Sequence, residues 1–233
     1  MIGEKTVKNF WGYISTEKYS VGTTGGCVYV YDKMGTELAR FKDMHYAYDL
    51  AFFPDGKRLV VRSNEGLIAI YDLEKLQFVK KFRYGKAKDP HDGNLCISKD
   101  GSLIYVIVYT YNEKKQGPET WLDVYETETF TRVKRLLKDE EFFLNYIERI
   151  VDKDEFYLLG SFKEDWCIAK LCGDKMEARP ISEKEHERIF WIKNWELSGF
   201  SKKSAEWTSK SQRNNLERIE NPLAELWGRV SKR

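Results

Sequence analysis

The alternation of apolar and polar residues from Tyr48 to Arg83 predicts four short β-strands joined by tight turns. The first turn contains Pro54-Asp55-Gly56, in which proline fixes φ and glycine tolerates a positive φ. The predicted strands cover residues 48–53, 58–63, 67–72 and 77–82. A four-stranded meander of this length cannot bury both of its faces by itself, so we expect the pattern to recur along the chain.

The pattern does recur, most clearly in its third strand. The anchor residues of this strand are spaced by 40, 54 and 46 residues, and they are Tyr31, Tyr71, Tyr125 and Leu171. The longest interval contains a polar insertion from Asn112 to Glu119. A basic fourth strand follows each anchor, at residues 37–42, 77–83, 131–137 and 176–181. Features at matching offsets in four units indicate a repeat protein.

A unit of about 40 to 45 residues with four strands, a Pro-Asp-Gly turn and a third strand that ends in Tyr-Asp resembles the blade of a WD40-type β-propeller. The Tyr-Asp pairs are Tyr31-Asp32 and Tyr71-Asp72, where regular WD40 repeats have Trp-Asp, and the Gly-His dipeptide of those repeats is absent. The resemblance covers about Asn9 to Ile181 and extends to the fold superfamily, not to one protein. It implies radially packed sheets that present binding loops at one face of a ring.

The predicted fold class is therefore all-β: a small β-propeller of four to five four-stranded blades, with a short helical C-terminal tail. We expect the propeller to occupy residues 1–200 and the tail to occupy residues 201–233. The predicted blades cover residues 9–42, 48–83, 93–137 and 144–181, with a degenerate fifth blade at 188–200.

The tail carries apolar residues at helical spacing on one stripe. Asn221-Pro222 divides the segment, since proline is favoured in the first turn of a helix, and this predicts two short helices. The stripe consists of Leu216, Ile219, Leu223, Leu226, Trp227 and Val230. Two alternatives follow. The stripe either docks on the propeller and protects a bare sheet edge, or it binds another protein as a helix in a groove.

Composition narrows the classes of partner. A formal net charge of +2 is too small to indicate a nucleic-acid-binding protein. No apolar run is long enough for a transmembrane helix, and the N-terminal residues lack the apolar core of a signal peptide, so we expect a cytoplasmic protein.

The four cysteines are expected to be buried free thiols. We expect no metal and no cofactor, because Cys167 and Cys172 have no second pair of ligands.

The connections between a fourth strand and the next first strand carry large apolar residues and all three histidines. In a propeller these connections share one face, where partners commonly dock, but the rings could instead fold beneath their loops, and the histidines could hydrogen-bond within their blades. With the tail stripe, the partner-binding candidates are Met44, His45, Tyr46, Tyr84, His91, Phe142, Phe143, His186, Leu216, Ile219, Leu223, Leu226 and Trp227.

No catalytic motif occurs in the sequence. Gly22-Thr23-Thr24-Gly25-Gly26 lacks the Lys-Ser/Thr of a phosphate-binding loop, and there is no Gly-x-Ser-x-Gly elbow. We therefore predict a non-catalytic scaffold or adaptor that binds a protein partner through the loops, the tail or both. The alternatives are a propeller that binds a small molecule or glycan, with or without hydrolytic activity, and an incomplete ring completed by self-association.

Overall fold

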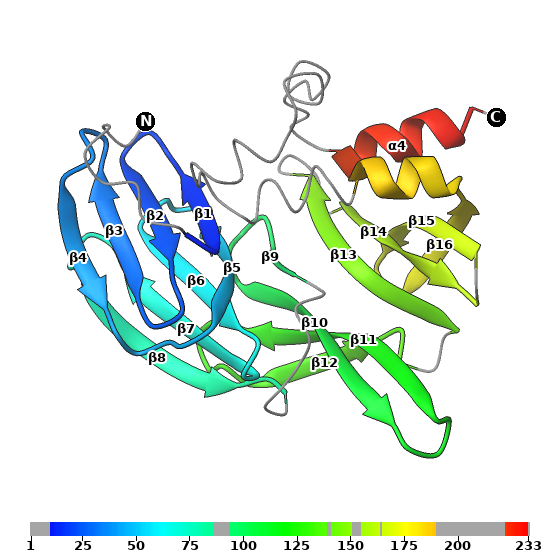
Figure 1. The fold of residues 1–233 in the computed structure, drawn as a ribbon, viewed down its shortest axis with the longest axis horizontal. Helices are drawn as coiled ribbons and strands as arrows, with labels where there is room; N and C mark the ends of the chain where they lie inside the picture. Colours follow the sequence, from blue (N-terminus) through cyan, green and yellow to red (C-terminus); the bar gives the residue numbers. More distant parts are fainter. Residues whose placement is uncertain are drawn as a thin grey trace. The chain divides into compact units, whose positions relative to one another are not determined.

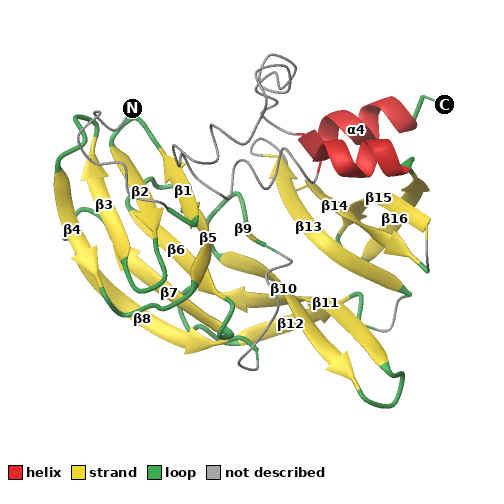
Figure 2. Ribbon diagram, viewed as in Figure 1, coloured by secondary structure: helices red, strands yellow, loops and turns green. Residues whose placement is uncertain are grey.

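The structure is a computed structural model, which describes residues 10–85, 94–138, 141–150, 155–163, 165–189 and 222–232. It contains four antiparallel sheets, and each sheet is a meander of four strands in chain order (Figure 1, Figure 2). The all-β fold class is therefore confirmed. The described residues form two compact units, residues 10–83 and residues 84–189 with 222–232.

The first unit contains two sheets. The strands of its first sheet are β1 (Gly12–Ser15), β2 (Tyr19–Thr23), β3 (Val28–Asp32) and β4 (Glu37–Phe41). The strands of its second sheet are β5 (Ala47–Phe52), β6 (Arg58–Ser63), β7 (Leu67–Asp72) and β8 (Gln77–Arg83).

The second unit contains two further sheets and two helices. The strands of the third sheet are β9 (Leu95–Ile97), β10 (Leu103–Asn112), β11 (Gly117–Glu126) and β12 (Arg132–Leu136). The strands of the fourth sheet are β13 (Phe142–Ile150), β14 (Glu155–Phe162), β15 (Asp165–Cys172) and β16 (Lys175–Pro180). The helices are one over residues 183–189 and α4 (Pro222–Val230). The polar insertion lengthens the β10–β11 hairpin, which pairs from Leu103–Glu126 to Asn112–Gly117.

The aspartate of each Tyr-Asp pair closes the turn after the third strand of its sheet. Asp32 Oδ1 accepts hydrogen bonds from the backbone N–H groups of Met34 and Thr36, both at 2.8 Å. Asp72 Oδ1 accepts the N–H groups of Glu74 and Lys75 in the same way, at 3.0 and 2.8 Å. Aspartate is favoured at such turns because its short side chain satisfies backbone donors two to four residues later.

The tyrosine of the repeat coincides with a β-bulge in the outer strand. Opposite Tyr31, Tyr71 and Tyr125, the pairing register shifts by one residue. The extra residues are Leu38, Val79 and Val133, and all three side chains are exposed. The fourth sheet has Leu171 at this position, and β15 pairs with β16 without a bulge. Bulges at sheet edges disfavour pairing with a further strand, so three of the outer strands are protected in this way.

The core of the first unit lies between its two sheets. Val21, Val28 and Val30 of the first sheet pack with Leu59, Val61 and Tyr71 of the second in one buried cluster. The ring of Tyr71 stacks on Phe41 of β4, with 4.5 Å between centroids. Tyr71 thus joins adjacent sheets, as a residue packed between propeller blades must.

The core of the second unit has the same arrangement. Ile107 and Leu122 of the third sheet pack with Leu144, Leu158 and Leu171 of the fourth. Polar side chains add directional contacts between these sheets. Asn94 Nδ2 donates to the carbonyl of Ile147, Asn94 Oδ1 accepts its N–H, and Thr120 Oγ1 accepts the N–H of Leu144, all within 2.8 Å.

Both helices lie beside the fourth sheet (Figure 2). The helix over residues 183–189 begins with a capping box, in which Ser182 Oγ and the carboxylate of Glu185 each accept the other residue's backbone N–H. This helix includes Arg188 and Ile189, which the sequence placed in a degenerate fifth blade at 188–200. The remaining residues of that predicted blade lie outside the described residues. Within the described ranges, neither helix combines the length and apolar composition needed to cross a bilayer.

Candidate functional site

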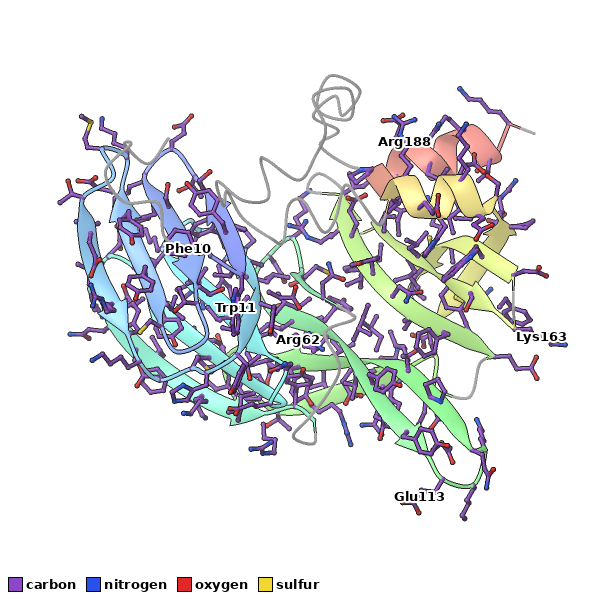
Figure 3. The ribbon with its side chains drawn as sticks, in the orientation of Figure 1. Phe10, Trp11, Arg62, Glu113, Lys163 and Arg188 are labelled. Atoms are coloured by element: carbon purple, nitrogen blue, oxygen red, sulfur yellow. The ribbon has the colours of Figure 1, made fainter. Side chains whose placement is uncertain are left out.

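Three aromatic side chains of the first unit stack on one another where its two sheets begin. Trp11 directly precedes β1 (Figure 3), and Tyr46 and Tyr48 lie immediately before and within β5. The centroid of Trp11 lies 6.0 Å from Tyr46 and 5.0 Å from Tyr48, and the interplanar angles are 21° and 13°. We call Trp11, Tyr46 and Tyr48 the aromatic stack.

The backbone beneath the aromatic stack is fixed at several points. Tyr46 has a φ of 51°, which a bulky residue rarely adopts. Its N–H donates to the carbonyl of Gly25 and its carbonyl accepts the N–H of Asn64, both at 3.1 Å. A Cβ on Gly25 would lie 2.9 Å from Trp11 Cη2, so any larger residue at this turn would require the indole to shift. The connection before β5 is thus tied to turns of both sheets.

The aromatic stack presents ring faces and almost no charge. Tyr46 is 48% exposed, Trp11 and Tyr48 are half-buried, and the neighbouring His45 is exposed. Burial raises the pKa of Tyr48, and the nearby Tyr46 adds to the rise, so the Tyr48 phenol is neutral at physiological pH. Such a surface can bind apolar or aromatic groups through ring faces and hydrogen bonds.

Of the loop residues that were predicted to bind a partner and that the structure describes, only His45 and Tyr46 are exposed. Met44, Tyr84 and Phe142 are buried, at 0%, 6% and 2% exposure, so these side chains belong to the core beneath the loops and not to a partner surface. Phe143 is half-buried and packs edge-on against Tyr109. Burial of these rings corresponds to the second alternative, in which the loop aromatics extend the core.

The structure describes two of the three histidines that were predicted to bind a partner. His45 accompanies the aromatic stack in the first unit, whereas His186 belongs to the second, and His91 lies outside the described residues. The imidazole of His186 stacks on Trp166, with 3.4 Å between centroids. Burial lowers its pKa, although Glu183 acts in the opposite direction, so the neutral form of His186 is favoured at pH 7.

The tail helix docks on the fourth sheet. In α4, Leu223 and Leu226 are fully buried and Val230 nearly so, and the helix contacts β13, β14 and β15. Trp227 lies beside Tyr157 and beneath the guanidinium of Arg179, 5.0 Å from the ring centroid. Leu223, Leu226 and Trp227 are therefore engaged within the chain. Leu216 and Ile219 lie outside the described residues.

A buried carboxylate holds the beginning of α4. Glu148 of β13 is 7% exposed, and its Oε2 accepts the backbone N–H groups of Leu223 and Ala224 at 2.9 and 3.1 Å. Pro222, the first residue of the helix, has no N–H to satisfy. A carboxylate at a helix N-terminus also interacts favourably with the helix dipole. Glu148 therefore acts as a capping residue supplied from 75 residues away in the sequence.

We expect Glu148→Ala to lower the free energy of unfolding by about 1 to 2 kcal/mol, because two N–H groups at the buried end of α4 lose their acceptor. Thermal unfolding, together with amide exchange of α4, measures the effect. The matched control is Glu225→Ala, which removes an exposed carboxylate of the same helix and should change stability by less than about 0.5 kcal/mol. Equal effects of the two substitutions would contradict the capping role.

Sequence reasoning missed Trp11, Tyr48, Gly25 and Glu148. Trp11 and Tyr48 lie at corresponding entries to their sheets, a correspondence that alignment of the first strands could have found. No sequence signal links Glu148 to α4. Within the described part of the chain, no three His, Cys, Asp or Glu side chains gather as metal ligands, and the four cysteines are free thiols. Only Cys167 among them is buried.

The four four-stranded sheets, with Tyr71 packed between the first two, define a propeller-like fold. No protein-family model matches the chain, and no curated protein matches it. Among solved structures 1085 chains match, so the fold is too widespread to indicate a function. One of them is hydrazine synthase of Kuenenia stuttgartiensis, with a TM-score of 0.61 and 16% identity over 78% of this chain and 53% of that one. The chain thus spans about half of that structure, and the likeness shows the fold alone.

Proposed function

We propose that this chain is a non-catalytic scaffold of divergent WD40-like repeats that binds a protein partner through the aromatic stack. The observation that carries the proposal is Tyr46, a half-exposed tyrosine held in a left-handed backbone conformation on top of Trp11. Strained residues persist where the surrounding structure fixes them, and they concentrate at functional sites.

The composition of the surface supports a protein partner. Tryptophan and tyrosine are prominent among the residues that contribute most binding energy to protein interfaces. Their aromatic rings carry a polar edge, so they tolerate contact with water in the free protein and burial in a complex. The hydrogen bonds of Tyr46 to Gly25 and Asn64 hold the ring in place before binding, so little conformational entropy is lost when a partner docks. The stack contains no charged side chain, which favours a partner that presents apolar or aromatic side chains.

Quantitative affinity capture from native extract tests the proposal. We expect the wild-type chain to retain a stoichiometric protein that Tyr46→Ala loses by tenfold or more, since truncating a central interface aromatic typically costs about 1.4 kcal/mol or more. The matched control is Tyr111→Ala, which removes a tyrosine that is 59% exposed on the β10–β11 hairpin. Equal recovery with all three chains, or no retained protein, would refute the assignment and direct attention to small ligands.

A further inference from the structure

A buried ion pair lies one residue away from the aromatic stack. Asp49 directly follows Tyr48 in β5, and Arg62 of β6 is its partner in the strand register. The Asp49 Oδ2 and Arg62 Nη1 atoms are 3.0 Å apart, and both side chains are almost completely buried. A buried ion pair costs more desolvation than an apolar pair of similar size, so stability alone is a weak reason for this one.

The ion pair adjoins a β-bulge that directs Tyr48 toward Trp11. The register of β5 with β6 shifts between Ala47 and Asp49, so Tyr48 is the extra residue of the strand. Ala47 and Asp49 are buried, whereas the half-buried Tyr48 ring stacks on Trp11. A slip of one residue in this register would exchange the buried and exposed positions. The contact with Arg62 opposes that slip, because it fixes which residue of β5 lies opposite β6 at this point.

The first sheet holds the other side of the bulge. The Thr23 hydroxyl of β2 donates to the Ala47 carbonyl at 2.8 Å, and the same oxygen accepts the N–H of Gly12 at 3.1 Å. A Cβ on Gly12 would lie 2.2 Å from the Tyr48 carbonyl oxygen, so the backbones of β1 and β5 approach closely here. Gly12 and Thr23 carry no charge. The bulge is thus fixed by neutral contacts from the first sheet and by the Asp49–Arg62 ion pair within the second.

The fourth sheet also has a bulge in its first strand, and an apolar pair follows that bulge. The register of β13 shifts between Leu144 and Tyr146, and Tyr146 lies opposite Leu159 of β14. Apolar packing therefore suffices for a bulge at this place in a sheet. In the second sheet, where the extra residue belongs to the aromatic stack, the corresponding pair is charged. What the charged pair adds is a group that a proton can neutralise.

We propose that the Asp49–Arg62 pair positions Tyr48 in the aromatic stack, and that partner binding weakens when the Asp49 carboxylate takes up a proton. This role rests on the proposed function of the aromatic stack and adds regulation by pH to it. Protonation removes the negative charge beside the Arg62 guanidinium, so the contact that fixes the β5 register weakens. Asp49 and Arg62 are positioning residues, because both are buried and act through Tyr48.

Asp49 titrates in a range in which such regulation is effective. Burial raises its pKa to about 6, and Arg62 is the charged group that opposes this rise. If only chains with ionised Asp49 bind, the apparent affinity falls in proportion to their fraction, which predicts binding about fourfold weaker at pH 5.5 than at pH 7.5. The exposed imidazole of His45 adjoins the stack, and histidines commonly titrate in the same range, so the test must separate the two groups.

The first measurement needs no partner. The indole N–H resonance of Trp11 in the full chain, identified by its loss in Trp11→Phe, is followed by NMR from pH 5 to pH 8. We expect a shift with a midpoint at about pH 6 in the wild type and no such shift in Asp49→Asn. Two controls should retain the shift. His45→Gln removes the exposed imidazole, and Asp55→Asn removes an exposed carboxylate at the turn of the same hairpin.

Affinity capture from native extract at pH 7.5 and pH 5.5 then measures the regulation. The protein that wild type retains and Tyr46→Ala loses should be recovered about fourfold less at pH 5.5, with wild type and with His45→Gln alike. Asp49→Asn should recover little of it at either pH. Circular dichroism verifies that each chain is folded, and if Asp49→Asn unfolds, the titrations of wild type and His45→Gln still decide the question.

The proposal is overturned if the Trp11 resonance does not titrate, or if its titration disappears in His45→Gln. It is also overturned if the protein is recovered equally at both pH values, in which case the aromatic stack remains a partner surface without this regulation. If the resonance titrates as expected but no protein is retained at either pH, the positioning of Tyr48 by Asp49 is supported and the proposed function is refuted. The two failures are therefore distinguishable.

Discussion

Replacing Tyr71 with aspartate is expected to unfold the protein at physiological temperature. Tyr71 has no exposed surface, stacks on Phe41 within the cluster that joins the first two sheets, and contacts Phe78 edge-on. An aspartate here would bury a charge without a partner and leave a cavity, each of which costs several kcal/mol. That sum is comparable with the total stability of a typical domain. Thermal unfolding followed by circular dichroism measures the loss, and an unchanged melting temperature would contradict the packing of this tyrosine between sheets.

Two further variants distinguish the ring of Tyr71 from its hydroxyl group. Among the described residues, the Tyr71 hydroxyl is buried without a hydrogen-bond partner, whereas that of Tyr125 contacts the carbonyl of Tyr84 at 3.3 Å. Tyr71→Phe should therefore be neutral or slightly stabilising, and Tyr125→Phe should lower stability by about 1 kcal/mol. As a control for aspartate substitution in general, Tyr111→Asp changes an exposed tyrosine and should have little effect on stability.

Arg62→Met is expected to destabilise the protein by an amount that grows with pH. Arg62 (Figure 3) and Asp49 form a buried ion pair on β6 and β5, at 1% and 3% exposure, with 3.0 Å between Nη1 and Oδ2. Burial raises the pKa of Asp49 from 3.8 to about 6, and the charge and hydrogen bond of Arg62 limit this rise. Without Arg62 the pKa of Asp49 must rise further. Removing one partner of a buried pair typically costs about 3 to 5 kcal/mol.

The sign of the pH effect follows from proton binding. Asp49 binds its proton more tightly in the folded state, so its contribution to stability falls as pH rises from 3.8 to about 6 and is constant above that range. In Arg62→Met the fall continues above pH 6, at up to about 1.4 kcal/mol per pH unit until the new pKa is reached. Urea unfolding at pH 5 and at pH 8 measures the difference between the two chains.

Two control variants isolate this titration. Arg58→Met removes a partly exposed arginine of the same strand, which pairs with Asp55, and should show a small cost that does not change above pH 6. Adding Asp49→Asn to Arg62→Met removes the titrating carboxyl and should abolish the extra pH dependence. If the double variant kept the steep slope, another group would be responsible.

The repeat made much of the fold predictable from the sequence. Four third strands aligned on Tyr31, Tyr71, Tyr125 and Leu171 located four sheets, because strand alternation and Asp-based turns are local properties. The helix over residues 183–189 was not predicted. Its capping box, Ser182 with Glu185, is a local signal, but the weak strand pattern from Arg188 onward was given more weight. The bulges depend on packing between sheets and could not be derived from one strand.

The candidate site was less predictable, because exposure is a tertiary property. Tyr46 and Met44 are both large residues of one connection, and Tyr46 is exposed whereas Met44 is buried. The local sequence contains no signal that distinguishes these two outcomes. The left-handed conformation of Tyr46 depends on Gly25 and Asn64, which belong to turns of two different sheets. Likewise, the docking of α4 depends on Glu148, a contact between residues 75 positions apart. Contacts of this kind appear only once the sheets are assembled.

Site-specific photo-crosslinking tests the central claim most directly. Benzoylphenylalanine is incorporated in place of Tyr46 in one chain and in place of Tyr111 in another, and both chains are irradiated in native extract. The account predicts a single prominent protein adduct at position 46, competed by unlabelled wild-type chain and not by Tyr46→Ala. An adduct formed equally at position 111, or the absence of a competable adduct at position 46, would contradict the assignment of the aromatic stack as the partner-binding surface.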